Sequence, residues 1–336
     1  MFIQRRTPAL VLAPMDGVTD ALMREVLTEI SPFSYCVTEF IRVSALVPSD
    51  RVFLSDVPEL NNGCKTLCGA PIQVQLLGGS PERLAASAQR AVELGAQGID
   101  LNFGCPAPTV NRHDGGATLL KYPERIEEIV GTVRAAVPHE IPVSAKLRLG
   151  WDCMSSIHAN AERAARGGAS WITIHGRTKM QGYTPPAYWR PIGEVRAMLD
   201  IPVVANGEIW GVDDLKRCQD ETGCEHFMIG RGALAEPGIV RACAQVLGMK
   251  VGPSHVDMLD GDPARWRDLL SMVVARSMIC NESERRSVSR LKQWLNYAHK
   301  RGTVSWFDEL KRMASHDEIL TRLSMHASTS SGREAA

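Results

Sequence analysis

Short apolar strands alternate with helical stretches along most of the chain, and this alternation is the strongest constraint on its fold. Ile72–Leu76 predicts a strand. Ser80 and Pro81 then predict the start of a helix, with a capping hydroxyl and a proline at the first helical position. Strands separated by helices form parallel βα units. The predicted strands are Leu10–Ala13, Tyr35–Thr38, Ile72–Leu76, Gly98–Asn102, Val143–Leu147, Trp171–Ile174, Val203–Ala205 and His226–Ile229.

The number and spacing of these strands favour an α/β fold of the closed (β/α)8 TIM-barrel type over an open sheet. A short internal repeat supports the barrel, because Ile141-Pro-Val leads to Lys146 and Ile201-Pro-Val leads to Asn206 in the same register. The chain has no Gly-x-Gly-x-x-Gly motif, which argues against a dinucleotide-binding doubly wound sheet.

With 336 residues, the chain is long enough for a barrel and a smaller appended domain. We assign residues 1–250 to the barrel and residues 251–325 to a C-terminal all-helical domain, because the pattern becomes purely helical after about Gly252. Residues 326–336 are expected to form a disordered tail. Within the barrel, Val47–Ala70 has prolines, glycines and no clear period, and predicts a long loop.

Polar residues follow the predicted strands at their C-terminal ends, which is the face of a (β/α)8 barrel that carries the active site. Any one of them has an ordinary alternative as a satisfied core residue or a solvated tip, but their common register favours a functional site. They are Met15, Glu39, Gln75, Asn102, Lys146, His175, Asn206, Glu208, Gly230 and Arg231.

Cys105 is the candidate reactive group, since it directly follows the Gly98–Asn102 strand and its position is restricted by the next residue, Pro106. A cysteine chosen blindly is more often a small buried hydrophobe. Here Asn102 and Asn111 flank it, and neither amide suits an apolar core. The surroundings of Cys105 therefore favour chemistry.

Two glycine-containing loops, Asn206-Gly207 and Gly230-Arg231-Gly232, follow the last two strands, where barrels commonly bind phosphate through backbone N–H groups. Arg231 could instead pair with a surface carboxylate. Lys146 and His175 would complement an electron-rich ring or a phosphate. This layout suits a flavin mononucleotide, FMN, lying across the barrel mouth.

The helical region is basic although the whole chain is neutral. Lys plus Arg and Asp plus Glu number 38 each, whereas residues 263–322 hold 12 basic and 7 acidic side chains, which hints at a polyanionic partner. One helix there carries an apolar stripe on one side, and its opposite face suits either RNA contact or an ordinary solvated surface. That face consists of Arg286, Arg290, Gln293, Tyr297 and Lys300.

Composition also limits the environment of the protein. The nine scattered cysteines are typical of reduced thiols in a cytoplasmic protein, and they do not form a metal site. No signal-peptide core precedes the first strand. No apolar run approaches the ~18 residues of a membrane span. We expect a soluble monomer without a metal ion or a membrane partner.

Taken together, the motifs resemble those of tRNA-dihydrouridine synthases over nearly the whole chain. Leu149-Gly-Trp-Asp and Lys292-Gln-Trp-Leu-x-Tyr are most similar to the C-type bacterial branch, which is associated with the uridine at position 16 of the D-loop. Glu208 stands where many members have Asp, and Phe103 where others have Met or Cys. The motifs that carry the resemblance are Ala13-Pro-Met-Asp-Gly, Thr38-Glu-Phe, Leu101-Asn-Phe-Gly-Cys-Pro, Gly115-Gly-Ala, Lys146-Leu-Arg, His175-Gly-Arg-Thr, Asn206-Gly-Glu and Gly230-Arg-Gly.

The resemblance implies an FMN enzyme that uses NADPH, with NADH as the alternative donor, to reduce a uracil within tRNA, with Cys105 as the general acid. Hydride would reach carbon 6 and the thiol would protonate carbon 5 of a uracil turned out of its stack. The implied flavin contacts are Pro14, Met15, Asp16, Gln75, Lys146 and His175, with Asn206, Gly207, Glu208, Gly230 and Arg231 at its phosphate. The implied substrate and tRNA contacts are Arg42, Asn102, Arg177, Tyr183, Arg286, Arg290, Lys292 and Tyr297.

Two alternatives stay open from sequence. One is a flavin barrel that acts on a free pyrimidine, as dihydroorotate dehydrogenases do, although the basic helical extension would then have no purpose. The other is a non-catalytic RNA-binding protein on an inactive barrel, for which we would expect Cys105 or Lys146 to be lost.

Overall fold

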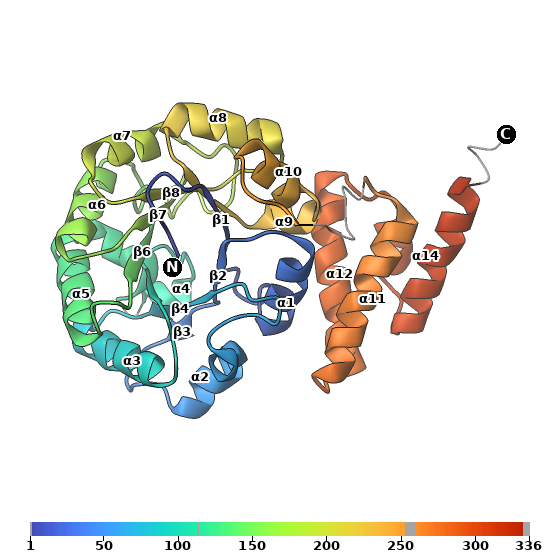
Figure 1. Ribbon diagram of the computed structural model, residues 1–336, viewed down its shortest axis with the longest axis horizontal. Coiled ribbons are helices and arrows are strands. Elements are labelled where there is room, and N and C mark those ends of the chain that lie inside the picture. The colour runs from blue at the N-terminus through green and yellow to red at the C-terminus, as the bar shows by residue number, and fades with distance from the viewer. Residues whose placement is uncertain (1, 113, 253–259, 332–336) are drawn as a thin grey trace. The chain divides into compact units, whose positions relative to one another are not determined.

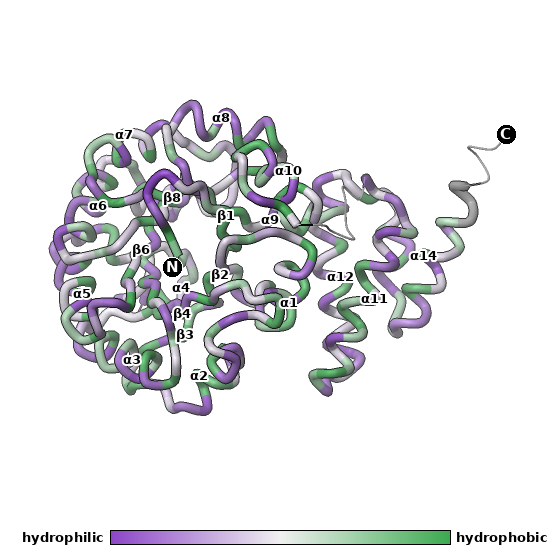
Figure 2. The backbone as a smooth tube through the Cα atoms, in the orientation of Figure 1, coloured by the Kyte–Doolittle hydropathy of each residue, from purple (hydrophilic) through white to green (hydrophobic). Residues whose placement is uncertain are grey.

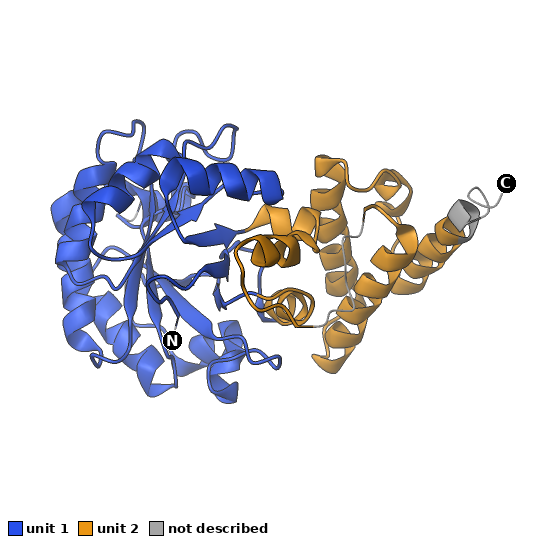
Figure 3. Ribbon diagram, turned by 45° about the horizontal axis from the view of Figure 1, so that its top comes forward, with its two compact units in different colours: residues 1–21, 33–229 blue, residues 22–32, 230–336 orange. Residues whose placement is uncertain are grey.

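A computed structural model describes residues 2–112, 114–252 and 260–331, with side chains described up to residue 327. The chain forms two compact units (Figure 3). The first comprises Met1–Ala21 and Phe33–Ile229, and the second comprises Leu22–Pro32 and Gly230–Ala336.

The first unit is a closed barrel of eight parallel strands, which confirms the predicted (β/α)8 fold (Figure 1). β1 pairs with β9 on one side and with β2 on the other, and β2 pairs with β4 to close the ring. A short additional strand, β3 (Ile41–Arg42), lies along the end of β4. The barrel strands are β1 (Ala9–Leu12), β2 (Tyr35–Val37), β4 (Ile72–Leu77), β5 (Ile99–Asn102), β6 (Val143–Arg148), β7 (Ile172–His175), β8 (Val203–Asn206) and β9 (His226–Ile229).

Helices of the first unit surround these strands, each with one apolar face toward them. α3 begins as the sequence predicts, because the Ser80 hydroxyl accepts a hydrogen bond from the N–H of Arg83 at 3.3 Å and Pro81 fills the first position. Figure 2 shows hydrophobic and hydrophilic stretches alternating along the outer helices. The elements are α2 (Asp50–Asp56), η1 (Pro58–Asn62), α3 (Pro81–Glu93), α4 (Pro108–Asn111), η2 (Gly116–Lys121), α5 (Pro123–Ala136), α6 (Ile157–Arg166), α7 (Arg190–Met198) and α8 (Val212–Thr222).

The barrel interior changes from apolar to polar along the strands. An apolar cluster includes Phe2, Tyr35 and Trp171, with the Phe2 and Tyr35 rings edge to face at 5.1 Å between centroids. Such aromatic pairs add about 1 kcal/mol to the gain from burial alone. Farther along the strands the buried side chains include Gln75 and Asp100, which are polar and hydrogen-bonded to each other. The apolar cluster contributes to the stability of the barrel. The buried polar side chains form the base of a candidate site.

The second unit is helical and is held together by tryptophans. Trp266 packs edge to face on Trp294 and Trp306, with centroids 6.1 and 6.4 Å apart. The Trp294 indole N–H also donates to the Leu234 carbonyl at 2.8 Å, which satisfies its only buried polar group. The helices are α1 (Ala21–Ile30, from its second residue), α9 (Arg231–Ala235), α10 (Ile239–Val246), α11 (Pro263–Ile279), α12 (Glu284–Arg301), α13 (Phe307–Leu310) and α14 (His316–Ser331).

Domain limits differ from the sequence prediction in two places. The second unit begins at Gly230 rather than at residue 251, and it takes in Leu22–Pro32 from the start of the chain. α14 continues to Ser331, so the prediction of a disordered tail is wrong for residues 326–331, and residues 332–336 lie outside the described part. Residues 253–259 of the predicted helical domain also lie outside it.

Over the described ranges, no helix combines the length and apolar character needed to cross a membrane.

Candidate active site

Neighbouring strands bring the predicted polar residues together in register. Asn102 on β5 is level with Lys146 on β6, and His175 on β7 is level with Asn206 on β8. Because the strands are parallel and closed into a barrel, these side chains share one end of it. The sequence prediction that strand-end residues cluster is therefore confirmed for these four.

Asp100 lies beneath this cluster and was not among the predicted site residues. Its side chain is buried and its carboxylate accepts hydrogen bonds from Gln75 Nε2 at 2.7 Å and from the Ser144 hydroxyl. Gln73 Nε2 donates to the same Ser144 hydroxyl at 2.9 Å. Burial raises the pKa of Asp100 to about 6, although the donors and the Lys146 ammonium oppose this rise. The sequence signal was a carboxylate between two apolar strand residues, Ile99 and Leu101.

Asn102 connects this network to Cys105. Its Nδ2 donates to Gln75 Oε1 at 2.8 Å. Its Oδ1 accepts from the backbone N–H groups of Gly104 and Cys105, both at 2.9 Å. The bond to Cys105 fixes the backbone of the loop that carries the thiol. In the structure its side chain shapes the reactive loop, and its predicted role in orienting a substrate uracil stays a prediction.

Asn111 holds the Cys105 loop from the other side. Its Nδ2 donates to the Ala107 carbonyl at 2.7 Å and to the Cys105 carbonyl at 3.2 Å. The N–H of Ala117 also donates to the Cys105 carbonyl at 3.1 Å. A Cβ atom added to Gly116 would lie 2.9 Å from that same oxygen, so the loop closes only over a glycine.

The Cys105 thiol remains protonated near neutral pH. Burial raises its pKa above the usual 9.0, and the Asp16 carboxylate acts in the same direction. The N–H of Ala107 and the cations Arg148 and Arg42 oppose the rise. A protonated thiol can give a proton to a developing carbanion, which is the role of a general acid. The environment of Cys105 is thus consistent with the predicted acid and unlike that of a thiolate nucleophile.

Lys146 and Asn206 meet at the ends of β6 and β8, where Lys146 Nζ donates to Asn206 Oδ1 at 3.2 Å. Asn206 Nδ2 donates in turn to the Met228 carbonyl at 2.8 Å, which fixes the amide orientation. Burial lowers the pKa of Lys146 to about 8, with Arg148 adding to the effect and Asp100 and Cys105 opposing it. Lys146 therefore carries a positive charge at neutral pH, and its pKa is sensitive to its surroundings.

His175 is buried against the loop that follows β8. Gly207 there has φ +112°, and a Cβ atom on it would lie 3.2 Å from the His175 ring. Only glycine allows both the left-handed backbone and this close approach. The Trp189 indole N–H donates to the Gly207 carbonyl at 2.9 Å and holds the turn.

Arg177 is not placed to contact RNA, which corrects its predicted role. Its side chain is 0% exposed and forms an ion pair with Glu208 at 2.7 Å, and its Nε donates to the Thr184 carbonyl at 2.8 Å. Glu208 itself has φ +57°, a left-handed conformation that is uncommon for a residue with a side chain. The pair joins the loops after β7 and β8.

Arg148 is a site residue to which the sequence assigned no role, although it belongs to the Lys146-Leu-Arg motif. It lies two residues after Lys146 on β6, so both side chains point to the same face of the sheet. Its Nε donates to the Gly104 carbonyl at 2.8 Å, and its NH1 donates to the Gly182 carbonyl at 2.8 Å. The guanidinium carbon lies 5.3 Å from the centre of the Tyr183 ring. Arg148 therefore joins the Cys105 loop to the loop after β7.

Exposed residues surround this buried set. Tyr183 is 56% exposed, with its ring 6.2 Å from that of His175. Arg42 is exposed, and its NH2 donates to the Thr109 carbonyl at 3.1 Å. Both side chains are exposed, and their predicted substrate contacts stay predictions. Pro14, Met15 and Asp16 form the turn after β1, in which the Met15 N–H donates to the Thr19 hydroxyl at 2.8 Å.

Gly230 and Arg231 fall in the second unit, at the start of the short helix α9. Their predicted phosphate role stays a prediction.

The predicted RNA face of α12 needs one correction. Arg290 NH2 pairs with Glu282 at 2.7 Å, and the two side chains are only 9% and 8% exposed. Arg286 pairs with the same carboxylate but is 71% exposed. Lys292 and Tyr297 are partly buried.

The barrel residues fit a flavin. Such a ring system presents carbonyl oxygens and ring nitrogens, and the site offers an ammonium on Lys146, an amide on Gln75 and an imidazole on His175. The glycine at residue 207 keeps space clear beside His175. Across the described ranges, no three His, Cys, Asp or Glu side chains are grouped to hold a metal ion.

Comparisons with known proteins find a matching family model and several similar proteins. The family model described as dihydrouridine synthase matches residues 11–330. A tRNA-dihydrouridine(16) synthase of Shewanella oneidensis is 43% identical over 314 residues, which cover 92% of this chain and 95% of that protein. One from Haemophilus influenzae is 42% identical over 93% of this chain and 98% of its own. One from Pseudomonas putida is 45% identical over 85% of this chain and 86% of its own.

Proposed function

The chain belongs to the dihydrouridine synthase family, and from this premise we propose that it reduces one uridine in the D-loop of tRNA to 5,6-dihydrouridine. The observation that carries the proposal is the Cys105 thiol, whose backbone is fixed by Asn102 and whose pKa is raised by burial, near Lys146. We further propose position 16 as the target, because the similar proteins of Shewanella oneidensis and Haemophilus influenzae are named for that position.

The chain's own residues perform the proton half of the reaction. A bound flavin supplies hydride, which reaches carbon 6 of the uracil. Cys105 Sγ then gives its proton to carbon 5, and the resulting thiolate recovers a proton from water. Asn102 fixes the backbone of Cys105 at 2.9 Å and so determines where the thiol points. Because a base in folded RNA is stacked, the uridine must first turn outward into the barrel mouth.

The flavin is proposed to be FMN, reduced by NADPH, with NADH as a possible donor. Gln75, Lys146 and His175 would hold its ring, together with the turn Pro14–Asp16. Its phosphate would bind at Asn206–Glu208, because glycine-containing loops after the last strands commonly bind phosphate in such barrels. The Arg177–Glu208 ion pair supports this proposal by stiffening that loop.

Contacts with tRNA are proposed for two surfaces, one in each unit. Arg42, Asn102 and Tyr183 would orient the uracil at the barrel mouth. In the helical unit, the exposed Arg286 and the partly buried Lys292 and Tyr297 would contact the RNA backbone. The protein is proposed to act as a monomer in the cytoplasm.

The direct test uses purified protein. Its cofactor is released by heat and identified, and NADPH oxidation is followed with unmodified tRNA, with free uridine and with orotate. The proposal expects FMN, and turnover with tRNA only. Turnover with a free pyrimidine would instead support an enzyme of small molecules. A protein that binds tRNA but cannot be loaded with any flavin would be a non-catalytic RNA-binding protein.

A further inference from the structure

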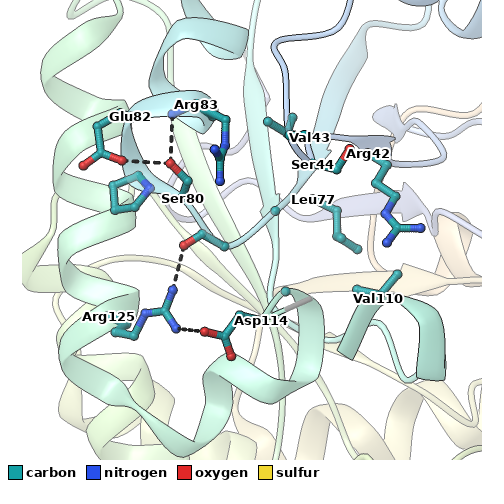
Figure 4. Close-up of a pocket in the computed structure, with 15 residues that line it drawn as sticks. Arg42, Val43, Ser44, Leu77, Ser80, Glu82, Arg83, Val110, Asp114 and Arg125 are labelled. Carbon is teal, nitrogen blue, oxygen red and sulfur yellow. Dashed lines mark hydrogen bonds and ion pairs between the residues drawn. The ribbon is translucent and has the colours of Figure 1, made fainter. Parts of the chain in front are cut away.

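A second hollow lies in the first unit, beyond the ends of β3 and β4, and we call it the rim pocket (Figure 4). Its volume is about 940 Å³. The residues that matter here are Arg42, Ser44, Ser80, Arg83 and Gly115. Arg42 ends β3 and Arg83 lies in the first turn of α3, and the close-up labels both. The residues proposed to hold the flavin ring do not line it.

The floor of the rim pocket is backbone, held by two glycines. A Cβ atom on Gly79 would lie 2.1 Å from the Asp114 carbonyl oxygen, and one on Gly78 would lie 2.6 Å from the Val43 carbonyl oxygen. Any side chain at these positions would force the loops apart. Arg125 also donates to the Gly79 carbonyl at 2.7 Å and ties α5 to the floor. The pocket is therefore a built feature of the barrel rim.

The carboxylates that line the rim pocket already have partners within it. Asp114 forms an ion pair with Arg125 at 2.8 Å, and Glu82 accepts a hydrogen bond from the Ser80 hydroxyl at 2.8 Å (Figure 4). Arg42 gives one hydrogen bond, to the Thr109 carbonyl. The exposed guanidinium of Arg83 forms no hydrogen bond or ion pair with any described residue. The pocket thus presents two arginines that can bind an anion.

The rim pocket and the reactive thiol share a wall. Val110 and Gly115 line the pocket. A Cβ atom on the next residue, Gly116, would meet both a Val110 methyl group and the Cys105 carbonyl oxygen at 2.9 Å. The hydrogen bond from Arg42 to Thr109 reaches the same segment, which runs from residue 105 to residue 116. A ligand in the pocket would therefore lie beside the loop that carries Cys105.

We propose that the rim pocket binds a backbone phosphate of the RNA strand next to the target uridine through Arg83, while Arg42, which also lines the pocket, keeps its proposed contact with the uracil. This inference rests on the proposed function. A uridine turned into the barrel mouth leaves its neighbouring phosphates at the rim, beside the Cys105 loop. Arginine forks match phosphate oxygens in pairs, and the Ser44 hydroxyl adds a polar group to the lining. A phosphate of the nicotinamide cofactor has the same chemistry, and the test separates the two sources.

The test compares Arg83→Ala with a control, Arg166→Ala. Arg83 lies in the first turn of α3, toward the rim, whereas Arg166 lies in the last turn of α6 and is 58% exposed. Both changes remove one exposed positive charge from the barrel. The affinity for unmodified tRNA is measured across a salt series, and the rate of flavin reduction by NADPH is measured separately.

We expect Arg83→Ala to lower tRNA affinity by about 3- to 10-fold and to reduce the salt slope by about one, because one phosphate contact is lost. Flavin reduction by NADPH should match the wild type, and Arg166→Ala should leave both measurements unchanged. Equal affinity and slope in Arg83→Ala and wild type would overturn the inference, as would a raised KM for NADPH with unchanged tRNA binding. A wild-type enzyme that does not reduce tRNA would instead refute the proposed function.

Discussion

The side-chain oxygen of Asn102 accepts a hydrogen bond from the backbone N–H of Cys105 at 2.9 Å, and this bond gives the reactive loop its conformation. The amide of Asn102 is itself oriented, because its Nδ2 donates to Gln75 Oε1 and Gln75 Nε2 donates to Asp100. An ionised carboxylate only accepts hydrogen bonds. Asp100 therefore determines how the side-chain amides of Gln75 and Asn102 are oriented.

Replacing Asp100 with Asn should disturb Cys105 without unfolding the barrel. The new amide can donate toward Gln75, which favours flipped Gln75 and Asn102 side chains and removes the acceptor from the Cys105 N–H. We expect single-turnover reduction of tRNA to fall by about 10²-fold, the usual cost of a small misplacement of a catalytic group. Ser144→Ala, which leaves the order of the amides intact, should cost less. Wild-type tRNA reduction by Asp100→Asn would contradict this account.

Replacing Cys105 with Ala should separate the two half-reactions. The thiol gives a proton only to the substrate, so NADPH should still reduce the flavin at a near-normal rate. Reduction of tRNA should fall by about 10² to 10⁴, the contribution of a positioned general acid. Both rates are measured by stopped-flow absorbance of the flavin, first without and then with tRNA. If the variant reduces tRNA at the wild-type rate, Cys105 has only a structural role.

The pH dependence of the enzyme should reflect Lys146. Its pKa is lowered to about 8, so the ammonium loses its proton near pH 8 rather than near its ordinary pKa of 10.5. The pKa of Cys105 is raised above 9.0, so the thiol keeps its proton over the same range. We expect flavin reduction by NADPH to slow as the pH rises through about 8, and Lys146→Gln to lack this alkaline decline. A wild-type rate that stays level up to pH ~10 would exclude this role.

The Arg177–Glu208 pair should stabilise the barrel. Glu208→Gln leaves the buried guanidinium without its countercharge, and we expect the free energy of unfolding to fall by about 3 kcal/mol. Arg177→Met combined with Glu208→Gln should cost less than the two single changes added together. Denaturant unfolding of the four proteins gives the coupling free energy. Additive losses would show that the two charges do not interact.

The helical unit offers two kinds of basic residue that should behave differently. Lys300 is exposed and Lys292 partly buried, so the double change to alanine should weaken tRNA binding and lower its salt slope by about 1 to 2. Arg290 is buried against Glu282, so Arg290→Gln should lower the Tm and leave the salt slope near wild type. Affinity across a salt series and thermal unfolding distinguish these effects. An unchanged slope in the lysine variant would place the RNA contacts elsewhere.

The barrel and the location of its site could be predicted from sequence, because both depend on local patterns. Strand spacing determines the fold, and the position just after each strand determines which end of the barrel a residue reaches. Lys146 and His175 were found in this way, and the register confirms their neighbours. The α2 and η1 helices within the predicted loop at 47–70 were missed, since their short turns carry little periodicity, although Phe53 anchors α2 by full burial.

Roles that depend on a distant partner could not be predicted. The helical pattern placed Arg290 on an exposed face, but the pattern cannot show that Glu282 lies before the helix and pairs with it. The motif around His175 contains Arg177, yet its partner Glu208 follows a different strand. Residues 326–331 have a composition typical of a tail, but they extend a helix whose earlier turns bury Ile319 and Leu323.

The most direct measurement is a map of dihydrouridine in tRNA from cells that lack this protein. The account predicts that dihydrouridine disappears from position 16 of the D-loop and from no other position. It should return when the wild-type chain is supplied, and it should stay absent with Cys105→Ala. Dihydrouridine that remains at position 16 in the cells without the protein, or returns in full with Cys105→Ala, would contradict the account.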